Sequence, residues 1–195
     1  MQKLQLQVLE KLELGPDDVV LDVACGTGVA VREAAKLARR AVGFDVSPGM
    51  IEEARKRAEG VANAEFLEGD VNSGLPFDDG EFTALLCSNA FHHFANQREA
   101  IAEFARVLAP GGRIVVADAN RRQPLVFALD LVLRSTQKSH VGFRSPRWIA
   151  RRMRRAGLRE TTIETIWKGG YAFVEAHRPG RRQLRRLGRR APRKR

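Results

Sequence analysis

The stretch VLDVACGTG, residues 20–28, constrains the fold of this chain most strongly, because a short apolar run leads directly into a glycine-rich turn. An apolar run that ends in such a turn is typical of a strand buried on both faces of a parallel sheet. The alanine-rich residues 29–38 follow and have a helical composition. The turn therefore joins a buried strand to a helix, which is the first unit of an alternating α/β fold.

The alternation of strand and helix continues along the chain. Strands are predicted at 19–24, 41–46, 64–71, 82–89 and 113–118. Helices are predicted at 29–38, 50–59, 96–108, 124–133 and 145–157, two of them after Ser-Pro starts. Residues 161–177 are expected to form a hairpin around Gly169 and Gly170. This order predicts a doubly wound, mostly parallel sheet, whose ligands bind beyond the carboxyl ends of the strands.

Length and composition favour one cytoplasmic domain. A chain of 195 residues can bury a sizeable core without a second domain. Its longest apolar candidate, residues 124–133, contains Asp130 and is shorter than the ~20 residues of a membrane span. The N-terminus lacks the pattern of a signal peptide. Cys25 and Cys87 fit buried thiols better than a disulfide framework.

The net charge of +11 is concentrated at the C-terminus. Residues 178–195 contain ten Lys or Arg and no acid, whereas residues 1–177 carry 24 basic and 23 acidic side chains. We therefore expect a nearly neutral domain over 1–177 and an arginine-rich tail over 178–195 that is disordered when free. The tail could contact nucleic acid or an anionic membrane, which would place the protein peripherally on that membrane. A solvated tail without a partner is the alternative.

Acidic residues at the strand ends indicate the charge of the ligand. Asp45 ends the second strand, where a carboxylate can accept hydrogen bonds from both ribose hydroxyls of an adenosine-bearing cofactor. NAD is disfavoured, because Val31 is too large for the third glycine position and Asp22 would repel a pyrophosphate. S-adenosylmethionine instead carries two cationic groups that Asp22 would attract. Its carboxylate would meet the N–H groups of the next helix, while Gly26 and Gly28 would let the backbone approach.

Five motifs in this order resemble the class I S-adenosylmethionine-dependent methyltransferases, particularly the small-molecule branch with the ubiquinone/menaquinone C-methyltransferases. The motifs are VLDVACGTG, GFDVSPGM, FLEGDVNSGLPF, NAFHHF and LAPGGRIVVAD. The resemblance covers roughly residues 15–177. It implies a Rossmann-like sheet of seven strands whose last hairpin adds an antiparallel strand.

The resemblance also implies which residues contact S-adenosylmethionine. Asp45 would hold the ribose, Met50 would pack on adenine, and Asp70 with Val71 would read the adenine edge. The segment at Ser88 would line the methionine end. The full implied set is Asp22, Ala24, Gly26, Gly28, Asp45, Val46, Met50, Asp70, Val71 and Ser88. Caps, turns and ordinary core packing are the alternative roles for these side chains.

His92 and His93 are the candidate catalytic residues, because they follow the fourth strand beside the expected methyl site. A histidine can deprotonate a phenol, an enol or an activated carbon. A structural pair that packs against the cofactor loop is the alternative, and no metal site is indicated. The segment Ser88-Asn89-Ala90-Phe91 lacks the proline motif of the enzymes that methylate the amino groups of bases. Cytosine C5 methyltransferases need a nucleophilic cysteine, typically after a proline, whereas Cys87 follows Leu86 inside a strand. Methylation of nucleic-acid bases is therefore disfavoured.

These features predict C- or O-methylation of a small, apolar or aromatic molecule. Residues 120–145 and the N-terminus are expected to form the substrate cap. A second hypothesis is a catalytically degenerate cofactor-binding protein that docks on nucleic acid or anionic membrane through its tail. A third is an oxidoreductase with an adenosine cofactor, which Val31 and Asp22 disfavour. The sequence does not indicate an oligomeric state.

Overall fold

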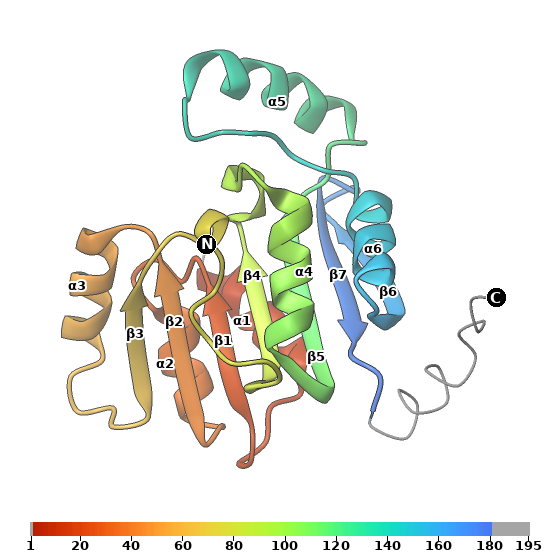
Figure 1. The fold of residues 1–195 in the computed structure, drawn as a ribbon. Helices are drawn as coiled ribbons and strands as arrows, with labels where there is room; N and C mark the ends of the chain where they lie inside the picture. The colour runs from red at the N-terminus through yellow and green to blue at the C-terminus, as the bar shows by residue number, and fades with distance from the viewer. Residues whose placement is uncertain (1, 181–195) are drawn as a thin grey trace.

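Seven strands form one sheet in the computed structural model, which describes residues 2–180. They are β1 (Val19–Val23), β2 (Arg40–Asp45), β3 (Ala64–Glu68), β4 (Phe82–Ser88), β5 (Leu108–Ala119), β6 (Arg159–Ile166) and β7 (Tyr171–His177). Their order across the sheet is β3-β2-β1-β4-β5-β7-β6 (Figure 1). Strands β1 to β5 pair in parallel, whereas β7 is antiparallel to both β5 and β6. The predicted Rossmann-like fold with its C-terminal antiparallel hairpin is confirmed.

Two strand boundaries differ from the sequence prediction by three residues or more. β3 ends at Glu68 rather than at residue 71, because the Asp70 carboxylate accepts a hydrogen bond from the Asn72 N–H at 2.9 Å. That bond caps the short 3-10 helix η1 (Val71–Ser73). β5 begins at Leu108 rather than at residue 113, because Leu108 pairs with Phe82 ahead of an irregularity in the ladder.

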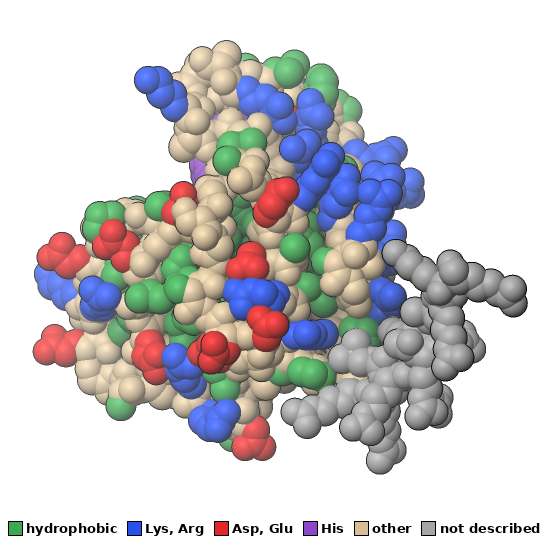
Figure 2. Space-filling view, in the orientation of Figure 1, with side chains coloured by type: hydrophobic (Ala, Val, Ile, Leu, Met, Phe, Trp, Pro, Cys, Tyr) green, Lys and Arg blue, Asp and Glu red, His purple; other side chains and the backbone are tan. Residues whose placement is uncertain are grey.

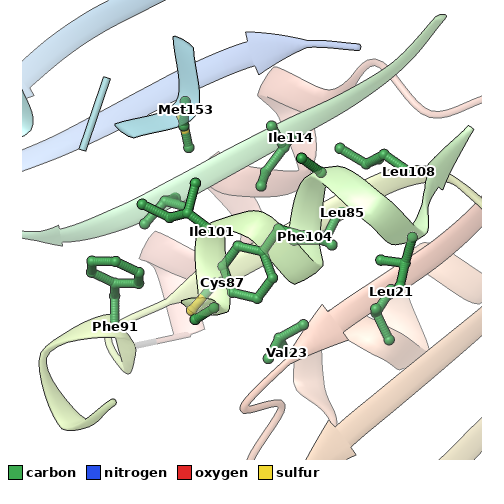
Figure 3. Packing of buried hydrophobic residues seen from close by; sticks show 14 of the residues in the cluster. Leu21, Val23, Leu85, Cys87, Phe91, Ile101, Phe104, Leu108, Ile114 and Met153 are labelled. Atoms are coloured by element: carbon green, nitrogen blue, oxygen red, sulfur yellow. The ribbon is translucent and has the colours of Figure 1, made fainter. Parts of the chain in front are cut away.

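Helices cover both faces of the sheet. They are α1 (Gln2–Leu12), α2 (Val29–Ala35), α3 (Pro48–Arg57), α4 (Gln97–Val107), α5 (Pro124–Thr136) and α6 (Pro146–Arg155). Helices α1, α2 and α3 pack on one face, and α4 and α6 pack on the other (Figure 1). In Figure 3, Phe104 of α4 lies over Leu85 of β4, and Met153 of α6 joins the same buried cluster. Burial on both faces explains why the strand sequences are almost continuously apolar.

The two Ser-Pro helix starts form as predicted. The Ser47 hydroxyl accepts a hydrogen bond from the Met50 N–H at 3.4 Å, and the Ser145 hydroxyl accepts one from the Trp148 N–H at 3.2 Å. A proline follows each cap at the first helical position, where its missing N–H costs no hydrogen bond. The first cap places α3 directly after Asp45.

The N-terminal segment differs from its expected role in a substrate cap. Val8 and Leu12 of α1 are fully buried, and α1 packs against α2, β4 and β5. Lys11 of α1 also forms ion pairs with Glu164 and Glu175 of the C-terminal hairpin, at 2.5 and 3.0 Å. This helix therefore covers the sheet, while α5 stands over the carboxyl ends of the strands (Figure 1).

The C-terminal hairpin continues into the first residue of the predicted tail. The Arg178 N–H donates to the Gly112 carbonyl at 2.7 Å, and its guanidinium donates to the Arg106 and Leu108 carbonyls. The rest of the tail, from residue 181, lies outside the described residues. Cys25 and Cys87 are buried free thiols, as predicted. Among the helices of residues 2–180, none has the length and hydropathy of a membrane span.

Gly28 and Gly26 have different reasons to be glycine. Both have positive φ angles, of 70° and 53°. A Cβ on Gly28 would lie 2.4 Å from the Phe66 ring and 3.1 Å from the Ala54 Cβ, whereas a Cβ on Gly26 would meet nothing within 4 Å. The sequence reasoning assigned both glycines to close approach of a ligand. The structure leaves open space at Gly26 and shows a packing requirement at Gly28, while the approach of a ligand to both stays a prediction.

We expect Gly28→Ala to destabilise the fold by about 2–4 kcal/mol, because it combines a left-handed backbone with overpacking against Phe66. The matched variant Gly26→Ala has only the backbone cost and should lose about 1–2 kcal/mol. Urea unfolding followed by circular dichroism measures both values. Equal losses in the two variants would contradict the packing requirement at Gly28.

Candidate functional site

The parallel register brings the carboxyl ends of β1, β2, β4 and β5 to one edge of the sheet. Asp22 of β1 pairs with Gly43 of β2 and with Leu86 of β4, and Ser88 of β4 pairs with Ala117 of β5. The glycine turn, the start of α3 and the His92–His93 segment all follow these strand ends. The sequence-predicted site residues therefore come from neighbouring strands at a single edge.

The Asp45 carboxylate connects the glycine turn to the start of α3. It accepts hydrogen bonds from the Gly26 N–H at 2.8 Å and from the Ser47 N–H at 2.9 Å, one on each oxygen. The side chain lies at the buried end of β2. Each oxygen keeps a lone pair, so Asp45 can still accept hydrogen bonds from the hydroxyls of a ligand.

Asp22 is a buried acid without a partner. It is 3% exposed, and its carboxylate accepts no hydrogen bond from residues 2–180. Burial, with a smaller contribution from the Asp45 carboxylate, raises the pKa of Asp22 to about 8. A buried carboxylate becomes favourable when a cation compensates it. The carboxylates at this edge thus suit a cationic ligand, such as one that carries a sulfonium and an ammonium group.

Apolar side chains flank this acidic edge. Val46 follows Asp45 directly and is 63% exposed, and Met50, in the first turn of α3, is 45% exposed. Ala24 has a positive φ of 63°, which turns the chain at the end of β1. Exposed apolar groups beside polar side chains are suited to the face of an aromatic ring. The predicted contact of Met50 with adenine remains a prediction.

The remaining predicted cofactor residues lie farther along the same edge. Asp70 caps η1 with one oxygen, which accepts hydrogen bonds from the Asn72 N–H and the Asn72 side-chain amide. Val71 and Ser88 are both 8% exposed. The second Asp70 oxygen accepts no hydrogen bond from the described residues, which leaves it free to bind a donor of the ligand.

His92 forms a hydrogen-bonded pair with an acid that the sequence reasoning missed. Its Nδ1 lies 2.9 Å from both carboxylate oxygens of Asp118, which is buried at the end of β5. The His92 backbone N–H also donates to Asp118, at 2.9 Å. An acid on Nδ1 keeps the proton on that nitrogen and leaves Nε2 as the basic atom. This arrangement suits a general base.

His93 and His140 complete an aromatic cluster around His92. The His93 Nδ1 donates to the Ser139 carbonyl at 2.8 Å, and burial lowers the pKa of His93. The rings of His93 and His140 lie 4.0 and 5.1 Å from the His92 ring, and Phe143 lies 4.6 Å from it. Within residues 2–180, no group of three or more His, Cys, Asp or Glu side chains is arranged to hold a metal ion.

Residues 20–112 match the family described as "Methyltransferase domain". This segment, somewhat less than half of the chain, thus has the sequence of a methyltransferase domain. Its ordered motifs resemble those of the class I, S-adenosylmethionine-dependent type. The matched segment includes the glycine turn, Asp45, Asp70 and the histidine pair, so it covers every predicted site residue.

Curated relatives of this domain include two demethylmenaquinone methyltransferases. The protein of Thermus thermophilus is 43% identical over 103 residues, which are 51% of this chain and 46% of that protein. The protein of Clavibacter sepedonicus is 38% identical over 99 residues, which are 51% of this chain and 40% of that protein. The matches thus span less than half of each relative.

Solved structures show the same fold for the methyltransferase domain. The YcgJ protein from Bacillus subtilis superposes with a TM-score of 0.80 at 20% identity, over 92% of this chain and 99% of that one. Geranyl diphosphate C-methyltransferase from Streptomyces coelicolor gives a TM-score of 0.73 at 19% identity, over 90% of this chain and 75% of that one. These likenesses confirm the fold.

Three acid or histidine residues near the site of the methyltransferase domain were missed from the sequence, namely Asp118, Asp130 and His140. Asp118 ends the strand 113–118, so its place at a strand end was a usable signal. Asp130 interrupts an apolar helix, and a lone acid in such a helix signals a buried contact. His140 gave no signal, because its contact with Asp130 depends on how the segment after α5 folds back.

We expect the affinity of the domain for S-adenosylmethionine to rise by about 20-fold between about pH 6 and about pH 7.5. Asp22 is mostly protonated below its raised pKa of about 8, and only its ionised form attracts a cation. The sulfonium of the ligand is cationic at every pH, and its ammonium group is mostly protonated over this range. Calorimetric titration at several pH values measures the slope.

Asp22→Asn should bind more weakly and lose this slope, while the exposed-acid control Glu59→Gln should keep it. If the affinity of Asp22→Asn for S-adenosylmethionine still rises with pH as in the wild type, another group causes the pH dependence.

Proposed function

We propose that this protein transfers a methyl group from S-adenosylmethionine to a carbon or oxygen atom of a small, apolar or aromatic molecule. The observation that carries the proposal is the unpartnered, buried Asp22 on β1, just ahead of the glycine turn. It supplies the negative charge that a cationic methyl donor needs, and Asp45 lies beside it to accept from a ribose. The demethylmenaquinone methyltransferases among the relatives support a small apolar acceptor.

The proposed cofactor residues have separate tasks. Asp22 compensates the positive charge of the methyl donor, and Asp45 binds the ribose while it fixes Gly26. Asp70 and Val71 bind the adenine edge, and Met50 covers its face. Ala24, Val46, Gly28 and Ser88 shape the walls. When bound, S-adenosylmethionine supplies an electrophilic methyl group, so positioning of the acceptor accounts for much of the rate.

His92 is the proposed general base. Its Nδ1 donates to Asp118, and its Nε2 forms no hydrogen bond with the described residues. Nε2 can therefore accept the proton that a hydroxyl or an acidic carbon loses during methylation. Asp118 is a positioning residue, because it acts by fixing the ring and tautomer of His92. His93 is the second candidate for the same task.

Residues 120–145 are the proposed substrate cap of a domain that extends over 1–177. The Val141 and Gly142 N–H groups both donate to the His92 carbonyl at 3.0 Å, so the cap is anchored on the histidine segment. Phe143 packs against the His92 ring. An acceptor enclosed by this segment would meet apolar surface next to a base.

We expect His92→Ala to lower the turnover number about 100-fold without changing the affinity for S-adenosylmethionine. Asp118→Asn should lower it about tenfold and shift the pH profile, since the ring loses its charged partner. Transfer of labelled methyl groups to demethylmenaquinol, or to apolar molecules of a cell extract, measures the turnover. His93→Ala is the matched comparison.

Full activity in both histidine variants would reduce catalysis to positioning alone. Binding of S-adenosylmethionine without transfer to any acceptor in the wild type would favour the alternative, a catalytically degenerate cofactor-binding protein.

We also propose that the arginine-rich segment 178–195 contacts nucleic acid or an anionic membrane. Ten positive charges without an acid in this segment support the proposal. Residues 181–195 lie outside the described residues, so the proposal rests on charge alone.

Deletion of residues 181–195 should leave the fold and the affinity for S-adenosylmethionine unchanged, because β7 and Arg178 remain. It should weaken binding to RNA or anionic vesicles, and this binding should fall steeply with salt in the full chain. Filter binding and vesicle sedimentation at two salt concentrations measure the effect. Equal binding with and without the segment would contradict the proposal.

A further inference from the structure

Helix α5 places its apolar side chains outward and its one acid inward. Asp130 is fully buried, whereas Leu125 is 76% exposed, Val132 is 56% exposed and Leu129 is 48% exposed. With 3.6 residues per turn, Leu125 and Val132 lie on the side of α5 opposite Asp130. This pattern is the reverse of that of a surface helix in a soluble domain, which buries its apolar side.

Hydrogen bonds to Asp130 hold α5 in this orientation. One carboxylate oxygen accepts from the His140 ring at 2.9 Å and from the Phe143 N–H at 2.8 Å. The other accepts from Arg121 at 2.8 Å and from Arg134 at 3.0 Å. Although burial opposes ionisation, these contacts lower the pKa of Asp130 below its ordinary value. The acid therefore stays charged, and rotation of α5 to bury its leucines would break its contacts with Arg121, His140 and Phe143, which lie outside the helix.

A basic surface adjoins the start of α5. Helix α6 buries Ile149 and Met153 and exposes Arg147, Arg151 and Arg154. A shallow cleft of about 470 Å³ lies along it, lined by Arg122, Ser145, Arg147, Ala150, Arg151, Arg154 and Ile163. This lining contains no acid, and none of its arginines forms an ion pair within residues 2–180. Figure 2 shows Lys and Arg side chains gathered over α6 and below α5.

The apolar and the basic surfaces meet at the start of α5. Arg122 lines the cleft and precedes α5 by two residues, and Leu125 follows on the first turn of α5. We name the combined surface, formed by Arg122, Leu125, Leu129, Val132, Arg147 and Arg151, the α5–α6 surface. Apolar side chains beside unpaired arginines match the two parts of an anionic lipid, its acyl chains and its phosphate.

We propose that the α5–α6 surface docks on an anionic lipid bilayer. Lipid phosphates occupy the arginine-lined cleft, and the outer side of α5 enters the boundary between head groups and acyl chains. A second copy of this chain fits less well, because docking of like surfaces would bring arginines against arginines. A nucleic acid would use the arginines and leave the apolar side of α5 exposed to water.

Docking in this way brings the sheet edge with Asp22 and Asp45 toward the bilayer, since α5 stands over that edge (Figure 1). An apolar acceptor dissolved in the membrane would then be close to the site. This consequence rests on the proposed function, whereas the docking itself does not.

Vesicle sedimentation of the full chain tests the proposal, with phosphatidylcholine vesicles and with vesicles that also contain phosphatidylglycerol. The double variant Leu125→Gln, Val132→Gln keeps every charge, and it should bind the anionic vesicles about tenfold more weakly than the wild type. Arg147→Gln with Arg151→Gln should show a similar loss. The matched controls Leu37→Gln and Arg39→Gln alter exposed residues next to α2 and should bind as the wild type.

Wild-type binding of the double α5 variant would overturn the proposal, because the C-terminal arginines would then suffice. Equal binding of the wild type to both kinds of vesicle would also overturn it. Sedimentation velocity without vesicles provides a further test. A wild-type dimer that becomes a monomer in the α5 variant would identify a self-association surface and overturn membrane docking.

Circular dichroism and calorimetry with S-adenosylmethionine check that each variant is folded. Should the double variant fail to fold, Leu125→Gln alone decides, because that side chain is 76% exposed and contributes little to the core. It should still bind anionic vesicles more weakly than Leu37→Gln does. Equal binding of these two single variants would overturn the proposal.

Discussion

The carboxylate of Asp45 is the contact on which the rest of the site depends. It accepts one backbone N–H from the turn after β1 and one from the start of α3, so two separate loops are fixed by one side chain. This places Asp45 beside Asp22, and the two acids share a poorly hydrated edge of the sheet. The fold tolerates this because Asp22 can remain protonated, with a pKa of about 8, until a cation arrives. The site thus contains acids without a compensating cation, and a positively charged ligand supplies that charge.

Acids also organise the other half of the site, where each one fixes a histidine. Asp118 holds His92 from the end of β5, and Asp130 holds His140 from within α5. The two pairs meet through ring contacts, and the backbone carbonyl of His92 accepts two N–H groups from the segment after α5. The candidate base and the candidate cap are therefore one connected unit. A change that moves α5 would alter the surroundings of His92.

The same Asp130 contacts decide what α5 presents to the outside. A helix rich in leucine would ordinarily bury those residues, yet here three polar contacts from outside the helix to one acid outweigh that tendency locally. The exposed leucines next to the arginines of α6 are the consequence. Enclosure of the site and recognition of a surface thus depend on one buried acid. These contacts of Asp130 also explain why an aspartate occurs in the middle of an apolar segment.

The sequence by itself determined the alternating α/β fold, the glycine turn, Asp45 at the end of β2 and the Ser-Pro helix starts, because these features depend on local backbone preferences and short-range periodicity. The distinct roles of Gly26 and Gly28 needed the tertiary structure, since Phe66, the residue that Gly28 must accommodate, lies on β3. The pairing of His92 with Asp118, 26 residues away, likewise follows from the parallel pairing of β4 with β5. The outward direction of α5 was decided only in the folded chain, because helical periodicity shows which residues share a side and not which side meets the core.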